Sequence, residues 1–226
     1  MRTLFITGTG TDVGKTLVTC LLGKQLANEG KKTQLIKPIE SGYNPENEGD
    51  IIRLLRAMNR EVSAEAIAEI SLYRLRAPFS PDMAARREGV TLDYRNILEF
   101  CRRERAVGQL LIEGAGGVMT PVAQCHTVLD LIADLGAPAL LVAGTYLGAI
   151  SHTLTALAAL AHRSIPVSGV VVSESSGAEN PSLEDTIITL KNFTDADMMA
   201  LPRLSGEGDE NAPELVQWLR LVCEGI

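Results

Sequence analysis

Residues 3–17 read TLFITGTGTDVGKTL and indicate the class of fold. Residues 3–7 form a short, mostly apolar run typical of a buried strand, and apolar residues with helical spacing begin directly after Thr16. A glycine-rich loop lies between them. A strand, such a loop and a helix in this order are the context of a phosphate-binding loop, because the backbone N–H groups and the dipole at a helix start attract an anion.

The loop departs from the strict phosphate-loop pattern by one position. That pattern requires glycine where Thr9 stands, and Gly8 comes one place early. A glycine-rich turn with a chance Gly-Lys-Thr at a helix start is the alternative, and we favour a nucleotide triphosphate site. Gly14 would let the backbone approach the phosphates closely, Lys15 would reach the outer ones, and the Thr16 hydroxyl would hold Mg²⁺.

Length, composition and charge restrict the class of protein. The 226 residues suit one α/β domain over 1–226, and 46% apolar with 22% charged residues is typical of a globular chain. The net charge of −7 argues against nucleic acid or an anionic membrane as a partner. No signal peptide, membrane span or C-x-x-C spacing is recognisable among the residues, so we expect a cytoplasmic protein with reduced thiols.

Strand and helix patterns alternate along the chain. This predicts a mainly parallel, doubly wound sheet that binds ligands at the carboxyl ends of its strands. Residues 40–49 read as a polar loop, and residues 61–76 are ambiguous. We expect strands over 3–7, 33–37, 109–113, 139–143, 167–172 and 198–201, and helices over 17–30, 51–58, 82–87, 93–105, 127–135, 148–161, 183–192 and 213–223.

Three charged residues at element ends are candidates for a site. Lys37 closes the second strand, where it would face either a ligand or water. Glu113 ends an apolar strand and precedes Gly-Ala-Gly-Gly; a carboxylate there needs a partner, and we favour Mg²⁺ over a cap on the following loop. Asp50 is more typical of a helix N-cap than of a ligand, and only its motif context favours the ligand role.

Three motifs together resemble the dethiobiotin synthetase family: 8–16, Lys-Pro-Ile-Glu-Ser-Gly at 37–42, and Glu-Gly-Ala-Gly-Gly at 113–117. Segments 77–81 and 147–152 are also similar to that family. The resemblance implies an ATP- and Mg²⁺-dependent ring closure that converts 7,8-diaminononanoate and CO₂ to dethiobiotin. A carbamate of one amine would be phosphorylated by the γ-phosphate, and the second amine would then expel phosphate. It also implies a homodimer with a shared active site.

The resemblance implies roles for individual residues. Catalytic groups would be the cations Lys15 and Lys37 and the hydroxyl donors Thr11 and Ser41, which suit the spread negative charge of a carbamate and a transferring phosphoryl group. The implied Mg²⁺ ligands are Thr16, Asp50 and Glu113. The residues implied to bind ATP are Asp12, Val13, Gly14, Lys15, Thr16, Leu17, Asp50, Glu113, Gly114, Ala115, Gly116, Ser173, Glu174, Pro202, Arg203 and Leu204.

The same resemblance implies how the diamine substrate is held. Its carboxylate would sit on a helix start of the partner subunit, a suitable anion site; ordinary helix initiation is the other explanation of that segment. The residues implied to bind this substrate are Thr11, Lys37, Ser41, Gly148, Ala149, Ile150 and Ser151.

The chain departs from the family pattern at several positions. Gly10 stands where the family often has Asp, and Asp12 where Glu is frequent. Ser173 and Glu174 replace the Asn-Asp of members that select adenine. Loss of an amide that both donates and accepts hydrogen bonds weakens base discrimination, so we expect ATP use with relaxed nucleotide selectivity.

Other phosphate-loop proteins remain alternatives. A regulatory ATPase of the MinD/ParA kind normally has an extra lysine early in the loop, and residues 8–13 contain none. Its cationic membrane helix would have little counterpart here, since Arg220 is the only cation of residues 214–226. An amidotransferase of cobyrinate type needs a glutaminase domain for which no residues remain. A related protein with a changed substrate is a third possibility.

Overall fold

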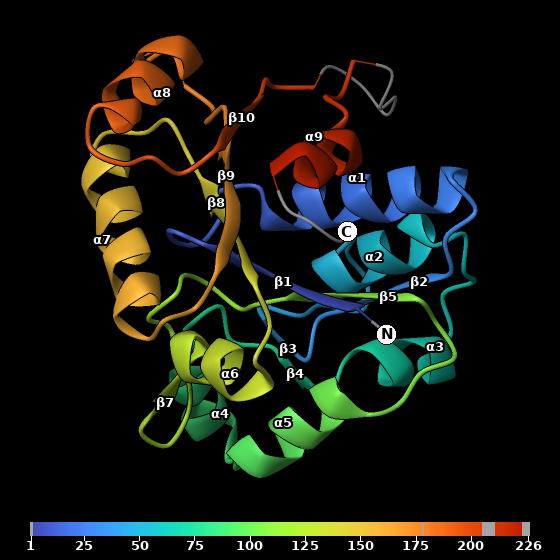
Figure 1. Cartoon of the computed structure of the whole chain (residues 1–226). Helices are drawn as coiled ribbons and strands as arrows, with labels where there is room; N and C mark the ends of the chain where they lie inside the picture. The colour runs from blue at the N-terminus through green and yellow to red at the C-terminus, as the bar shows by residue number, and fades with distance from the viewer. Residues whose placement is uncertain (1, 178, 205–210, 223–226) are drawn as a thin grey trace.

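The computed structural model describes residues 2–177, 179–204 and 211–222. Its centre is a parallel six-stranded sheet of order β10-β9-β8-β1-β5-β2, which confirms the predicted doubly wound α/β class (Figure 1). The inner strands are continuous apolar runs because helices cover both faces. The strands of this sheet are β1 (Arg2–Gly8), β2 (Thr33–Ile36), β5 (Gln109–Glu113), β8 (Ala139–Ala143), β9 (Val167–Ser173) and β10 (Met198–Leu201).

Helices pack on both faces of this sheet. Figure 1 shows α1, α2 and α9 on one face and α6, α7 and α8 on the other. From β1 the chain builds the sheet toward β2 on one side, and from β8 it builds toward β10 on the other. The direction therefore switches between β1 and β8, and such a switch point leaves a crevice at the carboxyl ends of the strands. The helices are α1 (Lys15–Asn28), α2 (Asp50–Ala57), α3 (Ala64–Ile70), α4 (Pro81–Glu88), α5 (Tyr94–Arg102), α6 (Val128–Leu135), α7 (Ala149–His162), α8 (Leu183–Lys191) and α9 (Leu215–Val222).

Two small sheets differ from the expectation. β3 (Ile39–Ser41) pairs in parallel with β4 (Tyr73–Leu75), although residues 40–49 were predicted as loop and 61–76 were ambiguous. β6 (Pro121–Ala123) pairs antiparallel with β7 (His126–Thr127), which was not predicted. Strands of two or three residues are too short to show an alternation of apolar and polar residues. The partner of β3 is distant in sequence, and the pairing of β6 with β7 is set by the turn between them.

The second strand of the large sheet is also shorter than predicted. β2 ends at Ile36, so Lys37 lies just beyond the strand rather than at its last position. Its backbone N–H bonds to the Ile70 carbonyl instead of to a sheet neighbour (2.9 Å). The chain turns here into β3, which brings Ser41 to the same edge as the end of β5.

The last helix packs on the body of the protein. α9 buries Leu215, Val216 and Leu219 and contacts α1 and β9, as expected of core packing. No helix of the described residues is long and apolar enough to cross a membrane. Residue 223, the predicted end of this helix, lies outside the described residues.

Candidate active site

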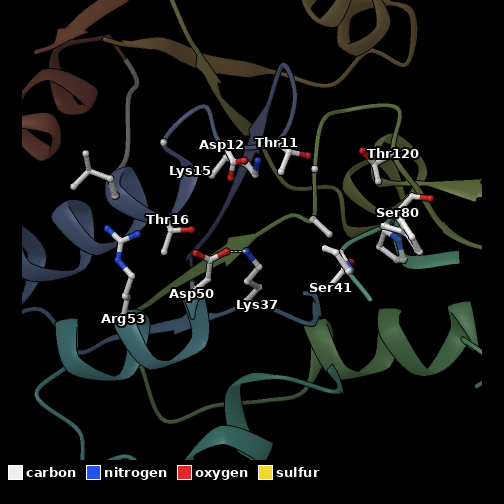
Figure 2. Close-up of a pocket in the computed structure, with 17 residues that line it drawn as sticks. Thr11, Asp12, Lys15, Thr16, Lys37, Ser41, Asp50, Arg53, Ser80 and Thr120 are labelled. Carbon is white, nitrogen blue, oxygen red and sulfur yellow. Dashed lines mark hydrogen bonds and ion pairs between the residues drawn. The ribbon is translucent and has the colours of Figure 1, made fainter. Parts of the chain in front are cut away.

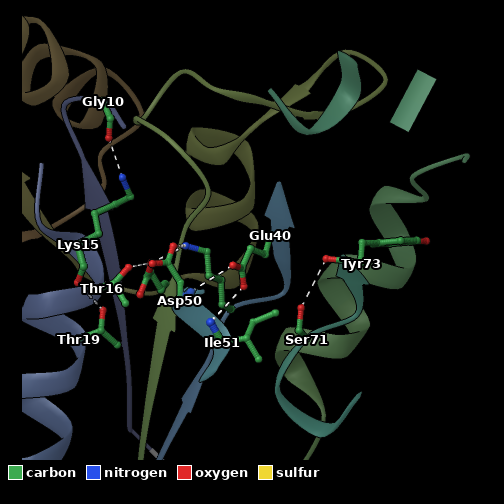
Figure 3. A network of polar contacts seen from close by, with 11 residues as sticks. Gly10, Lys15, Thr16, Thr19, Glu40, Asp50, Ile51, Ser71 and Tyr73 are labelled. Atoms are coloured by element: carbon green, nitrogen blue, oxygen red, sulfur yellow. Dashed lines mark hydrogen bonds and ion pairs between the residues drawn. The ribbon is translucent and has the colours of Figure 1, made fainter. Parts of the chain in front are cut away.

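The phosphate-binding loop joins β1 to α1 in a conformation that exposes backbone donors. Gly14, the N-cap of α1, has φ 96°, and Asp12 has φ 57°. The left-handed φ of Gly14 favours glycine there, and a Cβ would also force the Ser173 hydroxyl, 2.8 Å away, to move. The Lys15 ammonium, buried at the loop, donates to the Gly10 carbonyl at 2.6 Å (Figure 3). Burial, aided by the positive charge of Lys37, lowers the pKa of Lys15 to about 8.

A compact polar cluster lies beside this loop, where α1, β2, α2 and β5 meet. Lys37 donates to Glu113 Oε1 at 2.7 Å and also to Asp50 Oδ2. Thr16 donates its hydroxyl to the same Glu113 oxygen at 2.8 Å. Burial pulls the pKa of Lys37 down, but the two carboxylates outweigh it and raise that pKa. Burial likewise opposes ionisation of Asp50, yet Lys37 holds the pKa of its carboxyl below the ordinary value.

The cluster has the chemistry of a magnesium site. Glu113 is fully buried, and its Oε2 has no hydrogen-bond partner among the described residues. Thr16, Asp50 and Glu113 present only oxygen ligands, which Mg²⁺ prefers. The described residues contain no group of three or more His, Cys, Asp or Glu side chains suited to a metal. The two carboxylates and the Thr16 hydroxyl are too few to complete a metal site by themselves. They suit a cation that takes its remaining ligands from water and phosphate.

Glu40 fixes the start of α2 and with it Asp50. The N-cap of α2 is Gly49, which has no side chain to accept the free N–H groups of the first turn. Glu40 reaches across from β3 and accepts from the N–H of Asp50 (3.2 Å) and of Ile51 (3.1 Å), as Figure 3 shows. Burial raises the pKa of Glu40. Sequence analysis missed this residue, because the bond joins two elements separated by a loop.

These groups open into a cavity of about 680 Å³ at the sheet edge (Figure 2). Residues 78–81, part of the family-like segment 77–81, form one of its walls. Arg53 and Thr120 line it as well and were not predicted. Arg53 lies one helical turn beyond Asp50, so helical spacing could have indicated it. The predicted residues on its wall are Thr11, Asp12, Gly14, Lys15, Thr16, Leu17, Lys37, Ser41, Asp50, Ala115 and Gly116.

A second cavity, of about 620 Å³, adjoins the first across the phosphate-binding loop. Glu174 lies at the end of β9, and its Oε2 accepts from the backbone N–H of Arg203 at 2.8 Å. This bond joins two segments implied to bind ATP, residues 173–174 and residues 202–204. Of the predicted residues, Asp12, Val13, Gly14, Leu17, Ser173, Glu174, Pro202, Arg203 and Leu204 line this cavity.

Comparison with known proteins shows the family of this chain. A family model described as an AAA domain matches residues 2–205. An ATP-dependent dethiobiotin synthetase BioD of Caulobacter vibrioides is 44% identical over 97% of this chain and 99% of its own length. The chain belongs to the dethiobiotin synthetase family. Synthetases of the same name from Caulobacter sp. (45% identical; 90% of this chain, 89% of the relative) and Anaeromyxobacter dehalogenans (36%; 89% of each) are also similar.

The structural comparison shows a fold shared beyond this synthetase family. The MinD cell division protein of Aquifex aeolicus superposes with a TM-score of 0.51 at 19% identity, covering 98% of this chain and 87% of that one. MinD in its complex with MinC gives a TM-score of 0.52, also at 19% identity, and covers 98% of this chain and 86% of that one. At this identity the likeness concerns the fold alone. The synthetases are similar over most of the chain at 36–45% identity, so they favour a synthetase over the regulatory ATPase considered as an alternative.

The remaining residues implied by the synthetase resemblance lie apart from both cavities or behind them. Gly114 is packed against the Phe5 ring, where a Cβ would lie 2.8 Å from Phe5 Cε1. Residues 148–151 form the start of α7, with Gly148 as N-cap at φ 94°, and they line neither cavity within this chain. The preceding Leu147 is 92% exposed.

Proposed function

We propose that this chain closes the ureido ring of dethiobiotin from 7,8-diaminononanoate and CO₂, using ATP and Mg²⁺. CO₂ adds to one amine, the carbamate takes the γ-phosphoryl group, and the second amine then expels phosphate. The observation that carries this proposal is the cluster in which Lys37 and Thr16 bond to Glu113 at 2.7 and 2.8 Å beside the phosphate-binding loop. It brings a fixed cation and metal-type oxygens to the place where a terminal phosphate would lie.

In this proposal the protein positions reactants and stabilises charge. Both nucleophiles belong to the substrate, so no nucleophilic side chain is needed. Lys15 and Lys37 attract the phosphoryl and carbamate oxygens, while the hydroxyls of Thr11 and Ser41 donate hydrogen bonds to them. Mg²⁺ held by Thr16, Asp50 and Glu113 would neutralise charge on the phosphates.

We propose that the second cavity takes the nucleotide base with relaxed selectivity. Glu174 presents a carboxylate, which accepts hydrogen bonds only, and one of its oxygens already accepts from the Arg203 N–H. Such a group accepts equally from the amino groups of adenine, cytosine and guanine. Comparable kcat/KM values for ATP, CTP and GTP are expected, and strict dependence on ATP would refute this assignment.

We propose a homodimer in which the start of α7 completes the partner's site. The exposed Leu147 and the lack of a side-chain cap at the start of α7 support this, since a helix start binds carboxylates. The Ala149 N–H donates to the Tyr146 carbonyl (2.9 Å), so the N–H groups of Ile150 and Ser151 are the ones available to a carboxylate. Mixing a Lys37→Met chain with an Ile150→Glu chain should restore activity if each site draws on both chains. Two inactive variants that stay inactive when mixed would contradict the shared site. A cytoplasmic location stays a prediction.

The direct experiment supplies diaminononanoate, isotopically labelled bicarbonate, Mg²⁺ and ATP and looks for dethiobiotin by mass spectrometry. The label should enter the product, and one phosphate should be released per product. Glutamine should have no effect, in contrast to an amidotransferase. Lys37→Met should lose turnover but keep nucleotide binding, whereas Lys31→Met, at an exposed lysine away from both cavities, should behave as wild type. Near-normal turnover of the Lys37 variant would refute its role.

A further inference from the structure

Arg53 is a cation on the wall of both cavities, and no carboxylate is paired with it at hydrogen-bond distance among the described residues. It is exposed on α2 and lines both cavities. Its guanidinium makes no side-chain hydrogen bond or ion pair with any residue that the structure describes. One turn further along, Arg56 is held by Glu48, so the two arginines of this helix are used differently. Figure 2 shows Arg53 rising from α2 beside Thr16, on the side away from Lys37.

The charge of the site favours a further cation at this position. Asp12, Lys15, Lys37 and Asp50 line the first cavity, and Glu113 lies directly behind it. Two ammonium groups and three carboxylates leave this set with one net negative charge, and the Lys37 charge is already engaged by Asp50 and Glu113. A polyphosphate carries several negative charges; the proposed Mg²⁺ offsets part of them, and a further positive group on this wall reduces the repulsion that remains. Arg53 supplies that group.

The position of Arg53 indicates which part of a nucleotide it would meet. The two cavities share only Asp12, Gly14, Leu17 and Arg53 among the residues that line them. A nucleotide with its base in the second cavity and its terminal phosphate near Lys37 must cross between them here. Asp12 and Gly14 of the loop line this crossing, and Arg53 lines it from α2.

We propose that Arg53 binds the inner phosphates of the nucleotide and holds them against the phosphate-binding loop, an inference that rests on the proposed function. Guanidinium groups suit this role because their fork of donors matches two phosphate oxygens. Arg53 is then a determinant of affinity for diphosphates as well as triphosphates. Lys15 and Lys37 act further out, on the terminal group.

The test measures equilibrium binding of Mg-ATP, Mg-ADP and adenosine to Arg53→Met, Arg53→Lys and wild type. Met keeps the aliphatic stem and removes the charge. A charged hydrogen bond of ordinary strength predicts that Met weakens ATP and ADP about 10- to 100-fold, by similar factors, and leaves adenosine unchanged. Lys should recover part of the loss, because charge remains but the fork does not. Arg95→Met, the same change at an exposed arginine of α5 that lines neither cavity, is the matched control.

Three results would overturn the proposal. These are a loss no larger than that of the Arg95 control, a loss confined to ATP, or binding by Arg53→Lys as weak as that by Arg53→Met. The first would leave Arg53 a solvated surface group, and the second would place it at the terminal phosphate. Dethiobiotin formation by wild type, assayed in parallel, separates a failure of the Arg53 proposal from a failure of the proposed function. If wild type forms product but Arg53→Met binds normally, only the role of Arg53 is wrong.

Discussion

Replacing Lys37 by methionine should destabilise the protein even before any ligand is added. The substitution leaves Asp50 and Glu113 without their cation, and the Glu113 side chain is fully buried. Breaking a buried pair from one side costs about 3–5 kcal/mol. The Asp50 side chain is 35% exposed, which favours the lower end, about 3 kcal/mol. For a chain of this size that corresponds to a fall in Tm of roughly 6–12 °C.

The assay is thermal and urea unfolding at neutral pH in the absence of metal and nucleotide. Lys31→Met, an exposed lysine, should stay within about 0.5 kcal/mol of wild type. Asp50 has a lowered pKa when folded, so its stabilising pair with Lys37 is complete above its unfolded pKa and is lost as pH falls through the folded one. The difference in free energy of unfolding between wild type and Lys37→Met should therefore be largest at pH 7 and should shrink below about pH 4.

Two further measurements separate the lost ion pair from lost packing. Adding Glu113→Gln to Lys37→Met should recover part of the stability, because a neutral amide replaces an unpaired buried charge. Mg²⁺ alone should raise the Tm of the single variant more than that of wild type, since it binds the vacated carboxylates only in the folded state. A double variant no more stable than the single one, with no response to Mg²⁺, would refute this reasoning.

Three other substitutions test neighbouring features. Glu40→Gln should lower the free energy of unfolding by about 1 kcal/mol in urea titrations, because it weakens the acceptor for the N–H groups of Asp50 and Ile51; an unchanged midpoint would contradict the capping role. Gly14→Ala should weaken ATP binding in calorimetry by about tenfold or more, since φ 96° disfavours alanine and its Cβ would meet a serine oxygen at 2.8 Å. Glu174→Asn should raise kcat/KM for ATP relative to CTP, up to about tenfold; an unaltered ratio would place base selection elsewhere.

The large sheet could be predicted from the sequence because its strands are apolar runs long enough to recognise. β5 and β8 fall at the predicted residues, and a strand followed by a glycine-rich loop fixed the place of β1. β3 and β4 could not be predicted in the same way. Their pairing brings Ile39 opposite Tyr73, a contact between segments separated by two helices. Local periodicity contains no information on such a pairing.

The site was predictable where a motif carries its own geometry. The phosphate-binding loop is continuous in sequence, so Lys15 and Thr16 were placed by their neighbours alone. Lys37 was ambiguous until the structure set it at 2.7 Å from Glu113, because that contact depends on β2 and β5 lying side by side. Arg53 was missed for a different reason: its spacing from Asp50 was a weak signal, because an arginine on an exposed helix face is ordinary. The cavities that it lines are visible only in three dimensions.

The contacts of Lys37 also limit how it can act on a substrate. A lysine ammonium has three N–H donors, and here two are directed to Asp50 and Glu113. One donor remains for a phosphoryl or carbamate oxygen while both carboxylates stay bound. Since these carboxylates hold the ammonium in place, Lys37 is oriented before the nucleotide arrives, and little side-chain entropy is lost when the substrate binds. Asp50→Asn would loosen this orientation and weaken the proposed Mg²⁺ site while keeping the lysine charge. At saturating Mg²⁺ it should therefore lower kcat more than it raises KM for the diamine.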